Sequence, residues 1–151
     1  MSDPVQFAVR GIPVPQGSPR AFLTGGKARV VSGASRPSSP LGAWRTAIAT
    51  EAREAMGDRP LLAGPLTVSL WFTLPRPASH WLPVNGRRRE PELRLDAPEF
   101  VATSPDIDKL ARAGLDALTG VVYTDDRQVA RLHTDKSYGD VPGVEIRVVR
   151  L

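Results

Sequence analysis

The sequence of 151 residues contains no cysteine and only two histidines. Without cysteine the chain can form neither disulfides nor iron–sulfur clusters, and thiol catalysis is excluded. No apolar run approaches the roughly 20 residues that span a bilayer, and residues 1–4 show no basic segment followed by an apolar one. We therefore expect no membrane contact and no secretory signal, and the default class is a soluble intracellular protein.

Aromatic residues make up only 6% of the chain, whereas apolar residues reach 41% and charged residues 24%. These fractions are ordinary for a globular protein, so wholesale disorder is not expected. A length of 151 residues fits one domain that buries a core without disulfides or structural zinc. The chain also lacks the GxSxG, P-loop and HExxH patterns, so serine hydrolase, kinase and zinc-protease functions have no support.

The charge pattern favours a polyanionic partner. The net charge is +4, and 17 of the 20 basic residues are arginine, whose planar guanidinium pairs two-pronged with phosphate. Half of the ten aspartates nevertheless fall between Asp106 and Asp126. An acidic island in a basic chain suits a metal-dependent enzyme that acts on nucleic acid. The alternative is that these aspartates only mark helix caps and a turn.

Hydrophobic periodicity predicts strands and two helices along the chain. Apolar residues at three- and four-residue steps predict helices from Ser39 to Gly57 and from Pro105 to Gly120. Alternating apolar residues predict strands at 5–10, 66–74, 99–103, 129–133 and 144–148. The expected fold is a single compact α+β domain over residues 1–151, with a mixed sheet of four or five strands and two main helices.

Residues 18–38 and 75–98 are expected to be long loops, because glycine, proline and polar residues dominate them. Both loops carry basic side chains that suit a phosphate backbone. These are Arg20, Lys27, Arg87, Arg88 and Arg89. The alternative is that the loops are solvated and bind nothing.

Asp106 and Asp108 lie at the expected start of the second helix. Pro105 keeps the residue before it out of the helical region, so we expect an extended approach that turns both carboxylates to one side. Two adjacent carboxylates repel each other unless a cation lies between them, and their hard oxygens suit Mg²⁺, with Mn²⁺ as a substitute. The alternative is that they cap the helix.

Asp125 and Asp126 follow the same helix and its return. We expect them to bring a third carboxylate to the pair at the helix start, which makes a metal site able to activate water. Arg112 lies one turn beyond Asp108, where its guanidinium can stabilise charge on a phosphate. Arg112 can equally belong to a surface ladder with Asp108 and Asp116 at i, i+4 spacing.

The chain resembles the RusA family of Holliday-junction resolvases, common in phages and prophages. The resemblance rests on the run Asp106-Ile107-Asp108-Lys109-Leu110-Ala111-Arg112, on Leu115-Asp116-Ala117-Leu118-Thr119-Gly120, on Asp125-Asp126-Arg127-Gln128-Val129 and on the opening Ile12-Pro13-Val14-Pro15-Gln16-Gly17-Ser18-Pro19-Arg20. It covers roughly residues 104–139 and the first loop, and not the middle of the chain.

The resemblance implies roles for individual residues. Asp106, Asp108 and Asp126 are implied as metal ligands, and Asp125 as a residue that orders the turn or helps the site as a further metal ligand. Arg112 stands where the family's pattern has a catalytic basic residue, usually lysine. Lys109 stands where asparagine is common. Lys109, Arg112 and Lys136 are expected to contact DNA.

The implied activity is Mg²⁺-dependent cleavage of four-way junctions and related branched DNA by symmetric phosphodiester hydrolysis, on a RusA-like fold. A homodimer in the cytoplasm of a bacterial host cell is expected, because a two-fold junction needs two equivalent nicks. The departures at Lys109 and Arg112 keep a second hypothesis open, a branched-DNA-binding module that does not cleave. A third hypothesis is a metal-binding or structural domain unrelated to nucleic acid.

Overall fold

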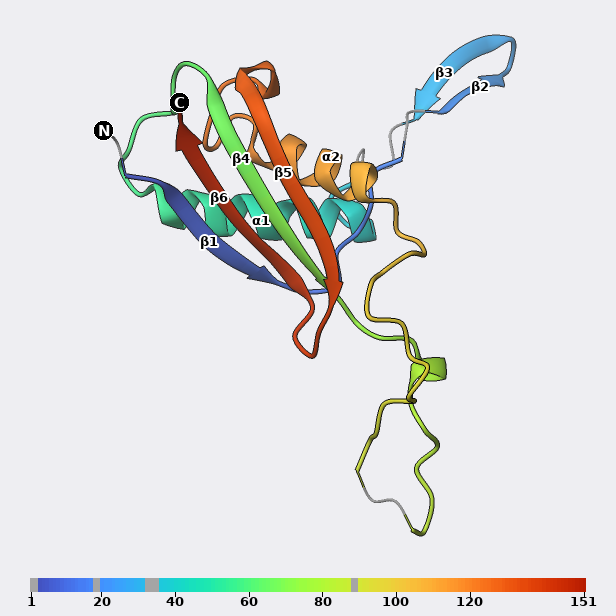
Figure 1. Ribbon diagram of the computed structural model, residues 1–151. Coiled ribbons are helices and arrows are strands. Elements are labelled where there is room, and N and C mark those ends of the chain that lie inside the picture. Colours follow the sequence, from blue (N-terminus) through green and yellow to red (C-terminus); the bar gives the residue numbers. More distant parts are fainter. Residues whose placement is uncertain (1–2, 18–19, 32–35, 88–89) are drawn as a thin grey trace.

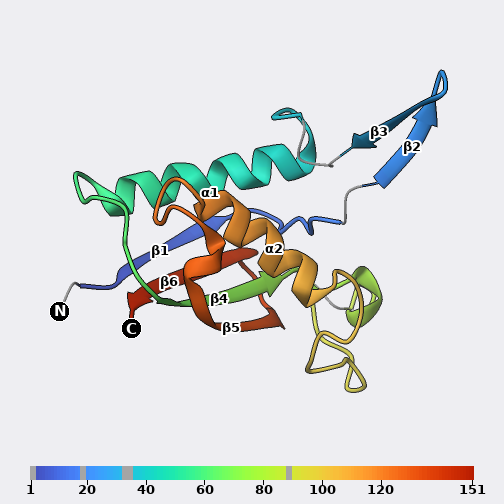
Figure 2. The same cartoon turned by 90° about the horizontal axis from the view of Figure 1, so that it is seen from above.

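A four-stranded sheet with two helices on one face forms the body of the molecule (Figures 1 and 2). The computed structural model describes residues 3–17, 20–31, 36–87 and 90–151. Within these ranges the sheet has the order β1-β6-β4-β5. Its strands are β1 (Val5–Arg10), β4 (Leu66–Leu74), β5 (Val129–Tyr138) and β6 (Gly143–Arg150). The expected single α+β domain with a mixed sheet is confirmed, because β4 pairs antiparallel with β6 but parallel with β5.

Helix α1 (Pro40–Met56) begins and ends where the sequence predicts. The hydroxyl of Ser39 accepts a hydrogen bond from the Gly42 N–H at 3.0 Å, which caps the helix. Gly57 ends it with a positive φ of 55°. The apolar stripe that the sequence predicts is buried against the sheet and the second helix, and consists of Leu41, Trp44, Ile48, Ala52 and Met56.

Helix α2 (Ile107–Leu118) lies beside α1 on the same face of the sheet (Figure 2). Its buried residues face β4, where every second side chain is fully buried. Gly114 lies against Leu70, and an added Cβ there would lie 3.3 Å from a Leu70 methyl carbon. The helix therefore packs close to the strand at this position. Among the described residues, no helix is both long and apolar enough to cross a membrane.

The expected irregular loop over 18–38 is wrong for residues 20–31. These form the hairpin β2 (Arg20–Thr24) and β3 (Lys27–Val31), which projects away from the sheet (Figure 1). Gly25 and Gly26 have φ values of 58° and 76°, and two consecutive positive values are what a two-residue hairpin turn requires.

Residues 75–105 form a long arm between β4 and α2 (Figure 1). The expected loop over 75–98 is confirmed in its described part, apart from the short helix η1 (Ala78–His80). The expected strand at 99–103 is wrong, because only Phe100 forms a bridge, with Ser137. Residues 99–103 therefore form no strand along β5 beyond this single bridge.

Candidate active site

The two aspartates of the DxD pair lie at the amino end of α2. Asp106 is the N-cap residue, with an extended backbone (φ −68°, ψ 135°), and Asp108 lies in the first helical turn. Both side chains are exposed, and Asp106 makes no capping hydrogen bond with its side chain. The extended approach that the sequence predicts is therefore present at Asp106, and the helix amino end favours the negative charge that gathers there.

Lys109 lies over this pair. Its Nζ is 3.0 Å from Oδ2 of Asp106, in an i, i+3 ion pair whose side chains are 45% and 56% exposed. An ion pair this exposed adds little stability. Its consequence is electrostatic, since the ammonium group of Lys109 offsets part of the negative charge of Asp106.

Lys136 supports the segment that leads into the helix. Its Nζ donates hydrogen bonds to the carbonyl oxygens of Thr103 at 2.7 Å and Pro105 at 2.8 Å. Lys136 belongs to β5, so these bonds tie the end of the long arm to the sheet directly before Asp106. The sequence predicts a DNA contact for Lys136, and the structure adds this internal role.

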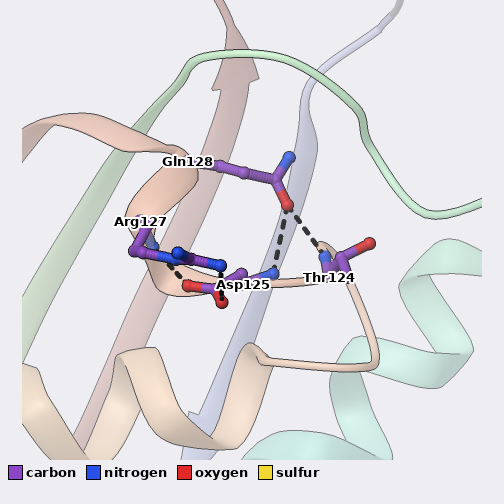
Figure 3. Close-up of polar contacts among 4 residues, drawn as sticks. All are labelled: Thr124, Asp125, Arg127 and Gln128. Atoms are coloured by element: carbon purple, nitrogen blue, oxygen red, sulfur yellow. Dashed lines mark hydrogen bonds and ion pairs between the residues drawn. The ribbon is translucent and has the colours of Figure 1, made fainter.

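Asp125 orders the turn before β5 (Figure 3). Its carboxylate accepts a hydrogen bond from the Arg127 N–H at 2.9 Å and pairs with the Arg127 guanidinium at 3.0 Å. The side-chain oxygen of Gln128 accepts hydrogen bonds from the N–H groups of Thr124 and Asp125. The bonds from Arg127 lower the pKa of the Asp125 carboxyl. Asp125 therefore orders this turn through its own carboxylate and backbone.

Asp126 begins the short helix η2 (Asp126–Gln128), on the far side of α2 from Asp106. It lies near the buried Tyr123, whose hydroxyl donates a hydrogen bond to the Leu115 carbonyl at 2.8 Å. Burial, followed by the negative charge of Asp126, raises the pKa of Tyr123. The Tyr123 bond places this turn near the carboxyl end of α2. Asp126 also lies just before the start of β5, whereas the Pro105 carbonyl next to Asp106 is bonded to Lys136 near the end of that strand.

The three aspartates expected as metal ligands do not converge within one chain. Helix α2 has 12 residues, which at about 1.5 Å per residue separates its ends by roughly 18 Å. In the part of the chain that the structure describes, no group of three or more acidic or histidine side chains is close enough to hold a metal ion. The expectation that Asp106, Asp108 and Asp126 of one chain meet is wrong, because the helix lies between them.

Arg112 lies exposed on α2, one turn beyond Asp108. It forms no ion pair with any described residue, so the expected ladder with Asp108 and Asp116 is absent. Asp116 accepts a hydrogen bond from Nε2 of Gln16 at 2.5 Å instead, and the Gln16 N–H donates to the Lys109 carbonyl at 3.0 Å. Gln16, for which no role was predicted, thus fastens the first loop to α2.

Two projections flank the amino end of α2 in both views (Figures 1 and 2). One is the β2–β3 hairpin, which carries Arg20 and the exposed Lys27. The other is the long arm, which carries the exposed Arg87. Arg88 and Arg89, also expected to contact phosphate, lie outside the described residues. Both projections at this end of the molecule therefore carry basic residues.

Comparison with known proteins gives two matches. A family model described as "Endodeoxyribonuclease RusA" matches residues 11–149, a span that includes both helices and every acidic residue discussed above. A protein of Bacillus subtilis (strain 168) that carries the name "Uncharacterized protein YqaN" is 28% identical over 146 residues, which cover 97% of this chain and 96% of that protein. The similarity therefore extends over the whole chain and is not confined to the acidic motif.

Proposed function

The chain belongs to the RusA endodeoxyribonuclease family, and from this premise we propose that it is a Mg²⁺-dependent endonuclease that resolves Holliday junctions and related branched DNA by symmetric phosphodiester hydrolysis. The observation that carries the proposal is the family match over residues 11–149, which includes the exposed acidic pair at the amino end of α2. Family membership implies a metal-dependent nuclease that acts on branched DNA.

Asp106 and Asp108 suit magnesium. Mg²⁺ is typically held by one or two carboxylates, with water and substrate phosphate as its other ligands. Both side chains are exposed, and that of Asp106 makes no capping hydrogen bond. Mn²⁺ has the same preference for oxygen donors. The bound cation would polarise the phosphate and lower the pKa of water. The protein itself supplies the carboxylates and fixes the backbone that carries them.

Arg112 is proposed to stabilise the charge that develops on the phosphate. Side chains on a helix lean toward its amino end, so Arg112 leans toward the turn that holds Asp108. Because it has no ion-pair partner among the described residues, its guanidinium is available for a phosphate oxygen. Two-pronged hydrogen bonds from such a group suit a phosphate better than the point charge of lysine.

Asp126 is proposed to act across a homodimer. One chain holds it at the opposite end of α2 from Asp106, and a two-fold dimer relates two copies of each end. Asp126 of one subunit can then join Asp106 and Asp108 of the other. Two equivalent composite sites would cut the two symmetry-related strands of a junction.

The basic projections are proposed to hold the phosphates of the junction arms. Lys27 on the β2–β3 hairpin and Arg87 on the long arm are exposed. Contacts of this kind release counterions, so junction affinity should fall steeply as salt rises. They carry no sequence information by themselves.

The proposal is tested with a labelled synthetic four-way junction. In Mg²⁺ the protein should introduce paired nicks at symmetry-related positions, and EDTA should prevent them. Linear duplex of the same sequence serves as the control and should remain intact. Junction binding without nicks in either Mg²⁺ or Mn²⁺ would instead support the non-cleaving module, which the Lys109–Asp106 ion pair favours.

Replacement of Lys136 with Met should slow junction cleavage by about tenfold to a hundredfold, because a small displacement of Asp106 is costly to catalysis. The slope of log affinity against log salt should stay unchanged if Lys136 positions the backbone before Asp106. A phosphate contact would instead lower that slope by about one when removed. Binding titrations at several salt concentrations, alongside cleavage rates, separate the two roles.

A further inference from the structure

A cavity of about 200 Å³ lies where the long arm joins the sheet. Its lining residues come from the arm and from the end of β5, and are Arg76, Trp81, Leu93, Tyr138, Gly139 and Asp140. This volume is below the roughly 300–1,000 Å³ of pockets for drug-sized ligands, so it suits one planar ring system. We propose that the cavity binds a single unstacked base of branched DNA beside the cleavage site, an inference that rests on the proposed function.

The walls of this base pocket are held in place before any ligand arrives. The guanidinium carbon of Arg76 lies 4.6 Å from the centre of the Tyr138 ring, and His80 meets the same ring edge-on at 5.3 Å. Arg76 also donates a hydrogen bond to the Pro98 carbonyl at 2.7 Å. These contacts join both legs of the arm to β5, so little conformational entropy remains to be lost on binding.

The chemistry of the lining fits a nucleobase. The half-buried Trp81 provides aromatic surface on which a base can stack, a contact that tolerates any base because each has a π face. Arg76 is a hydrogen-bond donor and the exposed Asp140 an acceptor, so both kinds of group on a base edge can be matched. An aliphatic ligand would form no hydrogen bond with either Arg76 or Asp140.

The base pocket lies at the same end of the molecule as the acidic pair. Leu74 and Tyr138 are register partners at the carboxyl ends of the parallel strands β4 and β5, where ligands of such sheets commonly bind. Lys136 is two residues before Tyr138 and reaches the Pro105 carbonyl, next to Asp106.

This position gives the base pocket a use in substrate selection. A base is removed from the stack at least cost where pairing is already disturbed, as at a branch point. Occupation of the pocket would therefore favour junctions over intact duplex.

The test uses a junction with 2-aminopurine at the branch point, bound to the Asp108→Asn variant so that no strand is cut. Binding should change the fluorescence of the probe. Trp81→Ala in the same background should abolish this change and weaken binding by about tenfold, the scale of one base–aromatic stack. Trp81→Phe should keep most of the fluorescence change. Trp71→Ala, on the sheet face away from the helices, is the matched control and should behave as the parent.

A fluorescence change that survives Trp81→Ala overturns the base pocket, while symmetric nicks from the unaltered protein would still uphold the proposed function. A protein that neither binds nor cuts junctions overturns both. Asp140→Asn provides an independent test, since Asp140 is exposed and outside the core. It should alter the relative cleavage of junctions that carry each of the four bases at the branch point, and an unaltered pattern would count against the pocket.

Discussion

Replacement of Asp108 with Asn should lower the rate of junction cleavage in Mg²⁺ by about a thousandfold. The amide has nearly the shape of the carboxylate but no charge, so Mg²⁺ would be held by fewer anionic ligands and its several kcal/mol of transition-state stabilisation would be largely lost. Asp106→Asn should have a comparable effect. Single-turnover cleavage of a labelled junction measures both.

Junction binding by these two variants should stay within about twofold of the parent, because phosphate contacts from elsewhere supply the affinity. Asp135→Asn is the matched control. Asp135 is an exposed aspartate on β5, beside Trp71 in the sheet register, and its removal changes the net charge equally. Full cleavage by the Asp108→Asn variant would show that this carboxylate is not a metal ligand.

Mixing two inactive variants, Asp108→Asn and Asp126→Asn, should restore cleavage. If Asp126 acts on the site of the other subunit, each mixed dimer contains one site with both residues intact and one site with both replaced. After subunit exchange at equal concentrations, half of the dimers are mixed, so about a quarter of all sites are intact. Most products should be junctions with a single nick, and few should be fully resolved junctions. Denaturing gels distinguish the two.

The matched control for this experiment mixes Asp106→Asn with Asp108→Asn. Both residues lie at the same end of α2, so every site of a mixed dimer would keep one damaged carboxylate and the mixture should stay inactive. If cleavage is restored only in the first mixture, the active site must be shared between the two subunits. If the first mixture remains as inactive as its parents, Asp126 does not act across the dimer.

The sequence was sufficient to predict the core of the fold. The stripe from Leu41 to Met56 and the alternation along residues 66–74 are periodic patterns, and burial followed them closely. The hairpin over residues 20–31 was missed because its strands are short and lie among residues typical of loops. Gly25-Gly26 between them was the available signal, since that dipeptide accepts positive φ at both positions.

The candidate site was predictable in composition but not in arrangement. Asp106, Asp108 and the turn-forming Asp125 occur where local sequence rules place them. The prediction that Asp126 joins Asp106 and Asp108 within one chain was wrong. Closeness in sequence does not determine which end of a helix the following turn approaches. The base pocket was also unpredictable, because it joins Arg76 and Trp81 to Tyr138 and Asp140, residues far apart along the chain.

The long arm is inserted between β4 and α2, and Arg76 fastens its two legs together near the sheet, through the Pro98 carbonyl and the Tyr138 ring. Among the described residues 77–87 and 90–97, beyond that fastening, none belongs to the buried hydrophobic core. The outer arm can therefore be lengthened, shortened or exchanged during evolution without disturbing the scaffold. Related proteins could thus acquire new DNA preferences by grafting different outer segments onto one unchanged catalytic body.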